Sequence, residues 1–182
     1  MNGAKTKLSP LMVSVMTFVL ALGILCGVLV SKRVGFDISG KSLDTSRAEI
    51  FKNGFLSSFI TFFFAALGAV HIFLTPLIFV SLFSRGLSYG FTAGTLVRIY
   101  NLAGFFRAAL GIGIYNFLAA AVFVPYAAYA FTKAAECRLN RANYAFVHRA
   151  NKVFLLISVS VLALLALLAL AECFIGASKM IL

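Results

Sequence analysis

The sequence predicts an all-α, polytopic integral membrane protein with about five transmembrane helices. Of its 182 residues, 62% are hydrophobic and only 12% are charged, and the mean hydropathy is +1.03. Soluble domains average about 45–50% apolar and about 25% charged residues, so this composition excludes a soluble globular protein. The length accommodates a single membrane domain over residues 1–182 and leaves no room for a second, soluble domain.

The first transmembrane helix is predicted over residues 11–31. This apolar run of about twenty residues is long enough to span a bilayer, and it ends in Lys32-Arg33 instead of a signal-peptide cleavage site. Gly23 and Gly27 form a GxxxG pattern, which is typical of a helix-packing face in membranes.

Two further spans are predicted over residues 53–73 and 76–94, joined by a very tight turn. The apolar region that holds them is too long for one ordinary span, and Pro76 is well placed to start a new helix. His71 lies near this turn. Intramembrane histidines act as proton relays or ligands, but the sequence near His71 offers no acid or second histidine, which favours an interfacial hydrogen-bonding role.

A re-entrant or interfacial segment is predicted near residues 95–107. Its apolar stretch is too short to cross the bilayer, and it carries Arg98, Asn101 and Arg107. Irregular backbone at membrane depth is tolerated where protein or a water-filled cavity surrounds it, and arginines suit headgroup depth.

The last two spans are predicted over residues 108–131 and 153–174. Pro125 removes one intrahelical hydrogen bond and should kink the fourth span. The segment 133–152 between them is basic and only weakly diluted by acids, so we expect it, and with it the N-terminus, to face the cytoplasm of a bacterial cell.

The rest of the basic residues also lie mostly between apolar runs and contribute to a net charge of +11. In that position they contact lipid headgroups and set topology, so membrane lipid is an expected partner and nucleic acid is not. The cysteines, Cys26, Cys137 and Cys173, lack the spacing of a metal site or a disulfide framework. We therefore expect no metal and no cofactor.

Three glycines at the end of the third span, Gly86, Gly90 and Gly94, recur every four residues and fall on one face of a helix. Such a face lets another backbone approach closely and pack by dispersion. We expect Gly90 and Gly94 to approach the region of Gly111 and Gly113 in the fourth span. The pattern does not decide whether glycine faces pack within one chain or between chains of a homo-oligomer.

A family resemblance rests on these glycines and their surroundings. Residues 83–97 read FSRGLSYGFTAGTLV, residues 101–104 read NLAG, residues 116–118 read NFL, and Val124-Pro125 follows. Together they resemble the stage II sporulation protein M family, whose members share a G-x-x-x-G-F-T-x-G block and a proline in the fourth helix. The resemblance covers residues 50–131. It departs at Ile114-Tyr115, where the family often has proline followed by a polar residue.

The resemblance implies a non-enzymatic membrane scaffold. The resemblance implies a component that anchors and localises a peptidoglycan-degrading complex during endospore engulfment. That complex contains the stage II sporulation proteins P and D. The chemistry would then belong to the partners in cell wall remodelling. Because the family also has members in bacteria that do not sporulate, sporulation itself does not follow from the resemblance.

Two alternatives to a scaffold remain open. A transporter or permease-like subunit would use broken helices around glycine and proline as a substrate site. Its polar lining would consist of Arg98, Asn101, Arg107, Asn116 and His71. An intramembrane enzyme is the third reading, but the sequence holds no recognisable nucleophile–base pair, metal-ligand cluster or phosphate loop.

Overall fold

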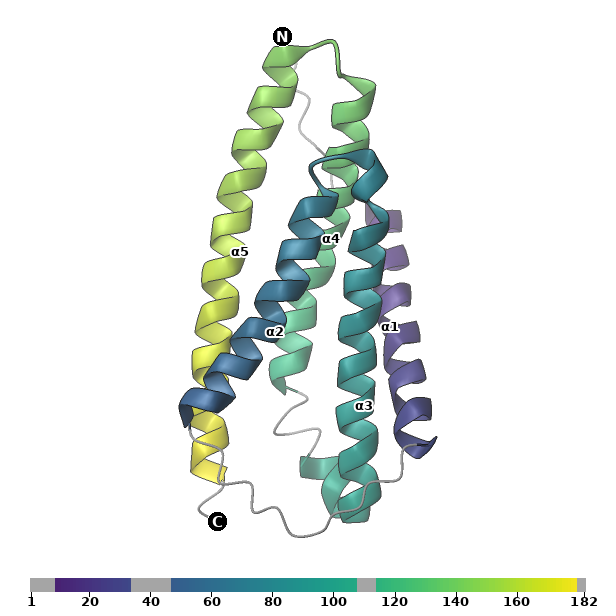
Figure 1. The fold of residues 1–182 in the computed structure, drawn as a ribbon, viewed down its shortest axis with the longest axis vertical. Coiled ribbons are helices and arrows are strands. Elements are labelled where there is room, and N and C mark those ends of the chain that lie inside the picture. The colour runs from purple at the N-terminus through teal and green to yellow at the C-terminus, as the bar shows by residue number, and fades with distance from the viewer. Residues whose placement is uncertain (1–8, 34–46, 108–113, 180–182) are drawn as a thin grey trace.

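The computed structural model is a bundle of long α-helices that run nearly along one axis (Figure 1). It describes residues 9–33, 47–107 and 114–179, with side chains described outside 47–54, 99–100, 102–105, 107, 114 and 172–179. The elements, in chain order, are α1 (Pro10–Arg33), α2 (Arg47–Gly68), the short 3-10 helix η1 (Ile72–Leu74), α3 (Pro76–Arg107), α4 (Ile114–Leu139) and α5 (Tyr144–Lys179). The predicted all-α membrane fold is confirmed.

Four helical segments in the described residues are long and apolar enough to cross a membrane. They are Pro10–Arg33, Ile72–Arg98, Tyr115–Leu139 and Tyr144–Ala171. The second predicted span, 53–73, corresponds to α2, whose described apolar part, Phe55–Gly68, is shorter than the others. After Gly68 the chain forms a turn and then η1, and Pro76 starts α3.

The third helix extends well past residue 94, where the predicted span ended. Residues 95–107, predicted as a re-entrant or interfacial segment, are helical, and a kink at Asn101 separates the end of the long helix from a short helical stretch that runs to Arg107. The continuation is broken at Asn101, whose φ of 53° and ψ of −135° are not helical. Asparagine tolerates positive φ better than most residues, so it suits this kink.

The fourth and fifth helices are also longer than predicted. Helix α4 continues through Pro125 to Leu139, and its predicted start, residues 108–113, lies outside the described residues. Helix α5 has 36 residues, which makes it about 54 Å long. Because the hydrocarbon core of a bilayer is only about 30 Å thick, the polar first turns of α5 extend beyond it.

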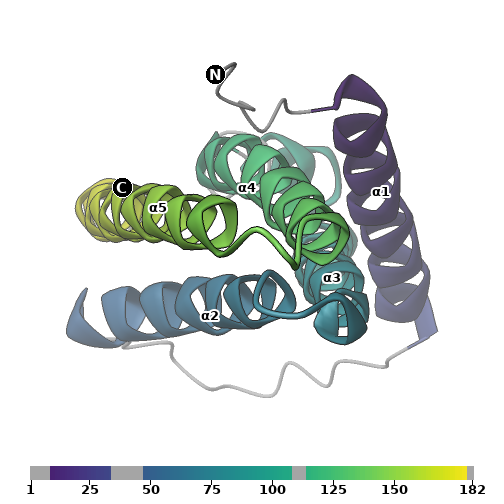
Figure 2. The same cartoon turned by 90° about the horizontal axis from the view of Figure 1, so that it is seen from above.

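The helices form two groups that meet at α3 and α4 (Figure 2). Helix α1 lies along α3 on one side, while α2 and α5 lie side by side on the other. Tyr126 of α4 joins the second group, because its ring stacks on Phe62 of α2 and on Phe154 of α5, at centroid distances of 5.1 and 5.8 Å. Its hydroxyl is 2.9 Å from the Oγ of Ser158.

Side chains form hydrogen bonds with backbone groups at two helix ends. Lys133 of α4 is buried and donates from Nζ to the carbonyl oxygen of Ala69, just after α2, at 3.1 Å. A cation at the C-terminal end of a helix also complements its dipole. At the start of α5, the side-chain oxygen of Asn143 accepts from the backbone N–H of Phe146 at 3.1 Å, which is a helix N-cap.

Candidate functional site

The tightest contact in the described bundle joins α1 to α3 through glycines. We call Gly23, Gly27, Gly86, Gly90 and Gly94 the glycine seam. A Cβ atom on Gly90 would overlap the carbonyl oxygen of Ile24, and one on Gly27 would overlap that of Leu87. The two backbones are therefore in direct contact, which only glycine permits at these positions.

The seam answers the question of which helix the glycines contact. We expected Gly90 and Gly94 to approach Gly111 and Gly113, which lie outside the described residues. The backbone that meets Gly90 belongs to α1 instead, and a Cβ on Gly94 would overlap the hydroxyl of Ser31. Both GxxxG patterns thus serve packing within one chain, because each fills the groove that the other leaves.

Arg98 closes the seam at its far end. Its Nη1 donates to the carbonyl oxygens of Ser31 and Lys32, each at 3.3 Å, so a guanidinium caps the C-terminus of α1. The last carbonyls of a helix lack intrahelical partners and carry partial negative charge. The described contacts of Arg98 thus give it a structural role at the helix end.

The polar residues proposed as a transporter lining do not gather in one place. His71 is exposed at the α2–α3 turn, where its Nδ1 accepts from the backbone N–H of Phe73 at 3.4 Å. Arg98 lies 22 residues beyond the start of α3 at Pro76, about 33 Å further along the helix axis. Asn101 is exposed at the kink, and the side chain of Arg107 lies outside the described part.

A buried arginine in mid-span is the functional candidate that sequence reasoning missed. Arg85 is only 6% exposed and lies midway between Ile72 and Arg98, the ends of a membrane-spanning segment. Charged residues at this depth are rare and costly, and they usually mark function.

Hydroxyl groups surround the Arg85 guanidinium. Its Nη2 donates to the Oγ of Ser58 at 2.8 Å, its Nε donates to the Oη of Tyr89 at 2.7 Å, and its Nη1 donates to the Oγ of Ser57. The guanidinium carbon also lies 4.8 Å from the ring centroid of Tyr89 and 6.0 Å from that of Phe123. Among the side chains that the structure describes, no carboxylate pairs with it.

Two signals in the sequence could have identified this site. One is the arginine itself, which stands in the middle of an apolar run. The other is the adjacent pair Ser57 and Ser58 in the apolar part of α2. The pairing needs the α2–α3 hairpin, because its tight turn brings the two helices into contact side by side.

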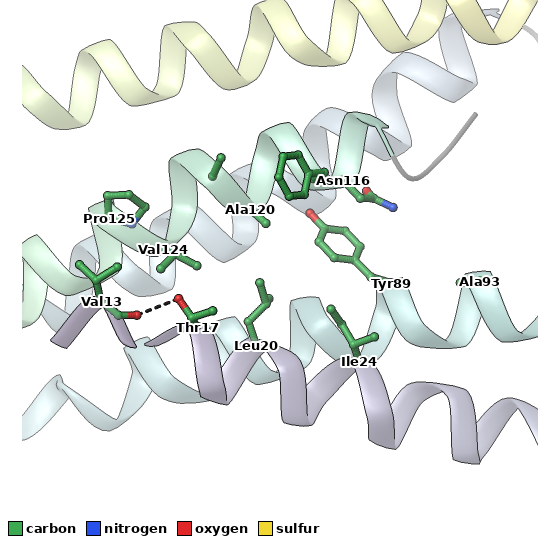
Figure 3. Close-up of a pocket in the computed structure, with 12 residues that line it drawn as sticks. Val13, Thr17, Leu20, Ile24, Tyr89, Ala93, Asn116, Ala120, Val124 and Pro125 are labelled. Atoms are coloured by element: carbon green, nitrogen blue, oxygen red, sulfur yellow. Dashed lines mark hydrogen bonds between the residues drawn. The ribbon is translucent and has the colours of Figure 1, made fainter. Parts of the chain in front are cut away.

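A groove of about 530 Å³ lies beside this cluster, between α1, α3 and α4 (Figure 3). Three small side chains on its walls, Ala93, Ala120 and Ala121, leave the space open. Tyr89 and Asn116 lie toward one end of the groove, whereas Val13 and Pro125 lie toward the other. Of the predicted polar residues whose side chains the structure describes, Asn116 alone lines it.

No family model, curated protein or solved structure matches this chain. In the described part of the chain, no group of three or more His, Cys, Asp and Glu residues is placed to hold a metal ion.

Replacing Gly90 with alanine should destabilise the bundle, because the added methyl group would overlap the Ile24 carbonyl and push α1 away from α3. Overpacking costs about 1–3 kcal/mol, and Gly90→Leu should cost more. The measurement is the free energy of unfolding in mixed micelles. Ala163→Leu on the exposed face of α5 is the control. A Gly90→Leu protein as stable as the wild type would show that the seam is incidental.

Arg85→Lys should destabilise the bundle more than Arg85→Met does. Lysine keeps the buried charge but lacks the planar fork that reaches Ser57, Ser58 and Tyr89 together. A buried charge that loses its partners costs about 3–5 kcal/mol, whereas Met leaves only neutral hydroxyls behind, and serine hydroxyls in a helix can bond the carbonyl four residues back. Thermal unfolding of both variants in detergent measures the order. If Arg85→Met were the less stable variant, Arg85 would be a structural residue that stabilises the bundle.

Proposed function

We propose that this chain is a non-enzymatic, multi-pass membrane scaffold that holds other envelope proteins at the membrane of a bacterial cell. The resemblance to the stage II sporulation protein M family supports a scaffold for a peptidoglycan-degrading complex. The glycine seam is consistent with this role, because a scaffold needs a rigid frame and the seam fixes α1 against α3 through backbone contact.

The observation that carries the proposal is the tip of the α4–α5 hairpin. Leu139 and Tyr144, at the hairpin ends of two membrane-spanning segments, are 84% and 81% exposed there. Exposed Arg138 and Arg141 flank them. Tyrosine and arginine are enriched among the residues that carry binding energy at protein interfaces, so Tyr144 and the two arginines favour a docking surface at the tip.

The charge at this end of the bundle also supports an orientation. The basic residues of the tip region are Lys133, Arg138, Arg141, Arg149 and Lys152, against the single acid Glu136. We infer that the tip and the N-terminal end of α1, which lie toward the same end of the bundle (Figure 1), face the cytoplasm. Asn140→Cys, made in a chain whose own three cysteines are changed to alanine, should then react with a membrane-impermeant thiol reagent only after the cells are opened. Labelling of intact cells would reverse the orientation.

Cross-linking in cells followed by purification of the full chain should recover a peptidoglycan hydrolase. Because a hydrolase acts outside the cytoplasm, the cytoplasmic tip of the scaffold would contact the cytoplasmic end of the segment that anchors the hydrolase in the membrane. The double variant Leu139→Ser, Tyr144→Ser should lose most of this recovery because the apolar anchors are gone.

Val70→Ser is the matched control, since Val70 is 68% exposed in the turn at the same end of the bundle. Its recovery of the hydrolase should equal that of the wild type. Recovery of no envelope protein, or equal recovery with the double variant, would count against the scaffold.

A permease-like subunit is the second candidate, and Arg85 is the observation that favours it. A cation held in mid-span by hydroxyl groups suits the passage or binding of an anion. Uptake of phosphate or short-chain carboxylates into proteoliposomes, lost in Arg85→Met, would favour this function. Uptake equal to that of protein-free liposomes would exclude it for these anions.

A further inference from the structure

The groove between α1, α3 and α4 crosses the middle of the bilayer. Gly23 of α1 faces Gly86 of α3, and the two helices run in the same direction. The lining begins at Val13, ten residues before Gly23, and reaches Ala93, seven residues after Gly86. At about 1.5 Å per residue this course is about 25 Å long, whereas the hydrocarbon core of a bilayer is about 30 Å thick. The groove therefore extends across most of the core.

This length favours a helix over lipid as the occupant. The acyl chains of the two leaflets end at the centre of the bilayer, so a groove that crosses the centre needs a chain from each leaflet. Each chain would lose conformational freedom on entering the groove. A transmembrane helix crosses the centre without interruption. Three small side chains on the wall, Ala93, Ala120 and Ala121, let such a helix approach closely.

A ridge of aromatic rings stands on α2, outside the groove. We call Phe55, Phe59 and Phe63 the phenylalanine ridge, because they recur every four residues on one side of the helix. Their rings stack in sequence, with centroid distances of 6.1 and 6.3 Å. Phe59 is 37% exposed and Phe63 is 49% exposed. Because stacking already restricts the rotamers of these rings, packing them into a groove costs little additional conformational entropy.

The phenylalanine ridge and the groove lie at the same depth, since both are level with Arg85. Phe59 follows Ser58, whose Oγ accepts a hydrogen bond from Arg85 at 2.8 Å. On the groove side, Val124 follows Phe123, whose ring centroid is 6.0 Å from the guanidinium carbon of Arg85. Copies inserted in the same orientation are related by rotation about the membrane normal, which leaves depth unchanged. The ridge of one copy can therefore meet the groove of the next.

We propose that the protein self-associates, with the phenylalanine ridge of one copy packed in the groove between α1, α3 and α4 of another. Helix α2 does not line the groove and lies on the far side of α3 from α1 (Figure 2), so a copy cannot fill its own groove. The contact is heterologous, and each copy binds one neighbour through its ridge and another through its groove. This assignment does not rest on the scaffold function, because it needs no other protein.

The test is disulfide cross-linking between two co-expressed copies in cell membranes, each with its own three cysteines changed to alanine. One copy carries Leu56→Cys, and the other, with a different tag, carries Ala121→Cys. Leu56 lies two residues before Ser58 and Ala121 lies two residues before Phe123, on helices that run in the same direction, so the two positions share one depth (Figure 1). Oxidation should produce a disulfide-linked dimer that carries both tags.

Ala163→Cys is the matched control for Ala121→Cys. Both alanines are exposed, and the antiparallel course of α4 and α5 places them at the same depth. Ala121 lies five residues before Tyr126, and Ala163 lies five residues after Ser158, whose Oγ is 2.9 Å from the Tyr126 hydroxyl. The pair of Leu56→Cys with Ala163→Cys reports random collisions and should yield little mixed dimer. Equal yields from the two pairs would overturn the proposal.

The double variant Phe59→Ala, Phe63→Ala, made in the copy that carries Leu56→Cys, removes two rings of the ridge. The yield of mixed dimer should fall about tenfold, which corresponds to about 1.4 kcal/mol of lost packing. Ile60→Ala, Phe64→Ala on the neighbouring exposed face of α2 is the matched control and should leave the yield unchanged. Circular dichroism and gel filtration in detergent establish that both double variants fold. A folded ridge variant that cross-links as well as its control would contradict the assignment.

Discussion

Direct contact between the backbones of α1 and α3 is the constraint on which the rest of the bundle depends. At Gly23, Gly27 and Gly90 the space beyond each Cα is occupied by backbone of the opposite helix, so any side chain would separate the pair. In a membrane, where apolar surface gains nothing by leaving lipid, this close dispersion contact replaces the hydrophobic effect as the force that holds helices together. The seam also fixes the rotation of both helices. It thereby sets which faces remain for α2 and α4.

The consequences of that rotation meet on α3. With its glycine face against α1, the helix turns Arg85 toward the serines of α2 and the ring of Phe123 on α4. Tyr89, one turn further on, receives a hydrogen bond from Arg85 and also lines the groove that α1, α3 and α4 leave between them. The buried cation and the groove are therefore linked through one phenol. A change at either one is expected to affect the other.

Much of the fold could be predicted from composition and spacing. Apolar runs of about twenty residues identify membrane helices because the bilayer fixes their length, and Pro76 marked the start of α3 correctly. Helix ends were less predictable. The polar residues 134–151 are expected to be helical and to continue the fourth helix beyond the membrane, but the structure divides them between α4, which ends at Leu139, and α5, which begins at Tyr144.

The site was harder to predict than the fold. A glycine face on one helix fits any smooth partner, so the spacing of Gly86, Gly90 and Gly94 could not choose between α1 and α4. Arg85 was visible as a charge in an apolar run, but its hydroxyl partners come from α2 and α3 and are known only once those helices are placed.

The central claim, that α1 and α3 meet through glycine, is tested most directly by solid-state NMR on protein labelled with ¹³C at glycine Cα in lipid bilayers. A cross-peak between Gly23 and Gly86 is the predicted result. Its absence, with cross-peaks from Gly90 to Gly111 or Gly113 in its place, would contradict the account.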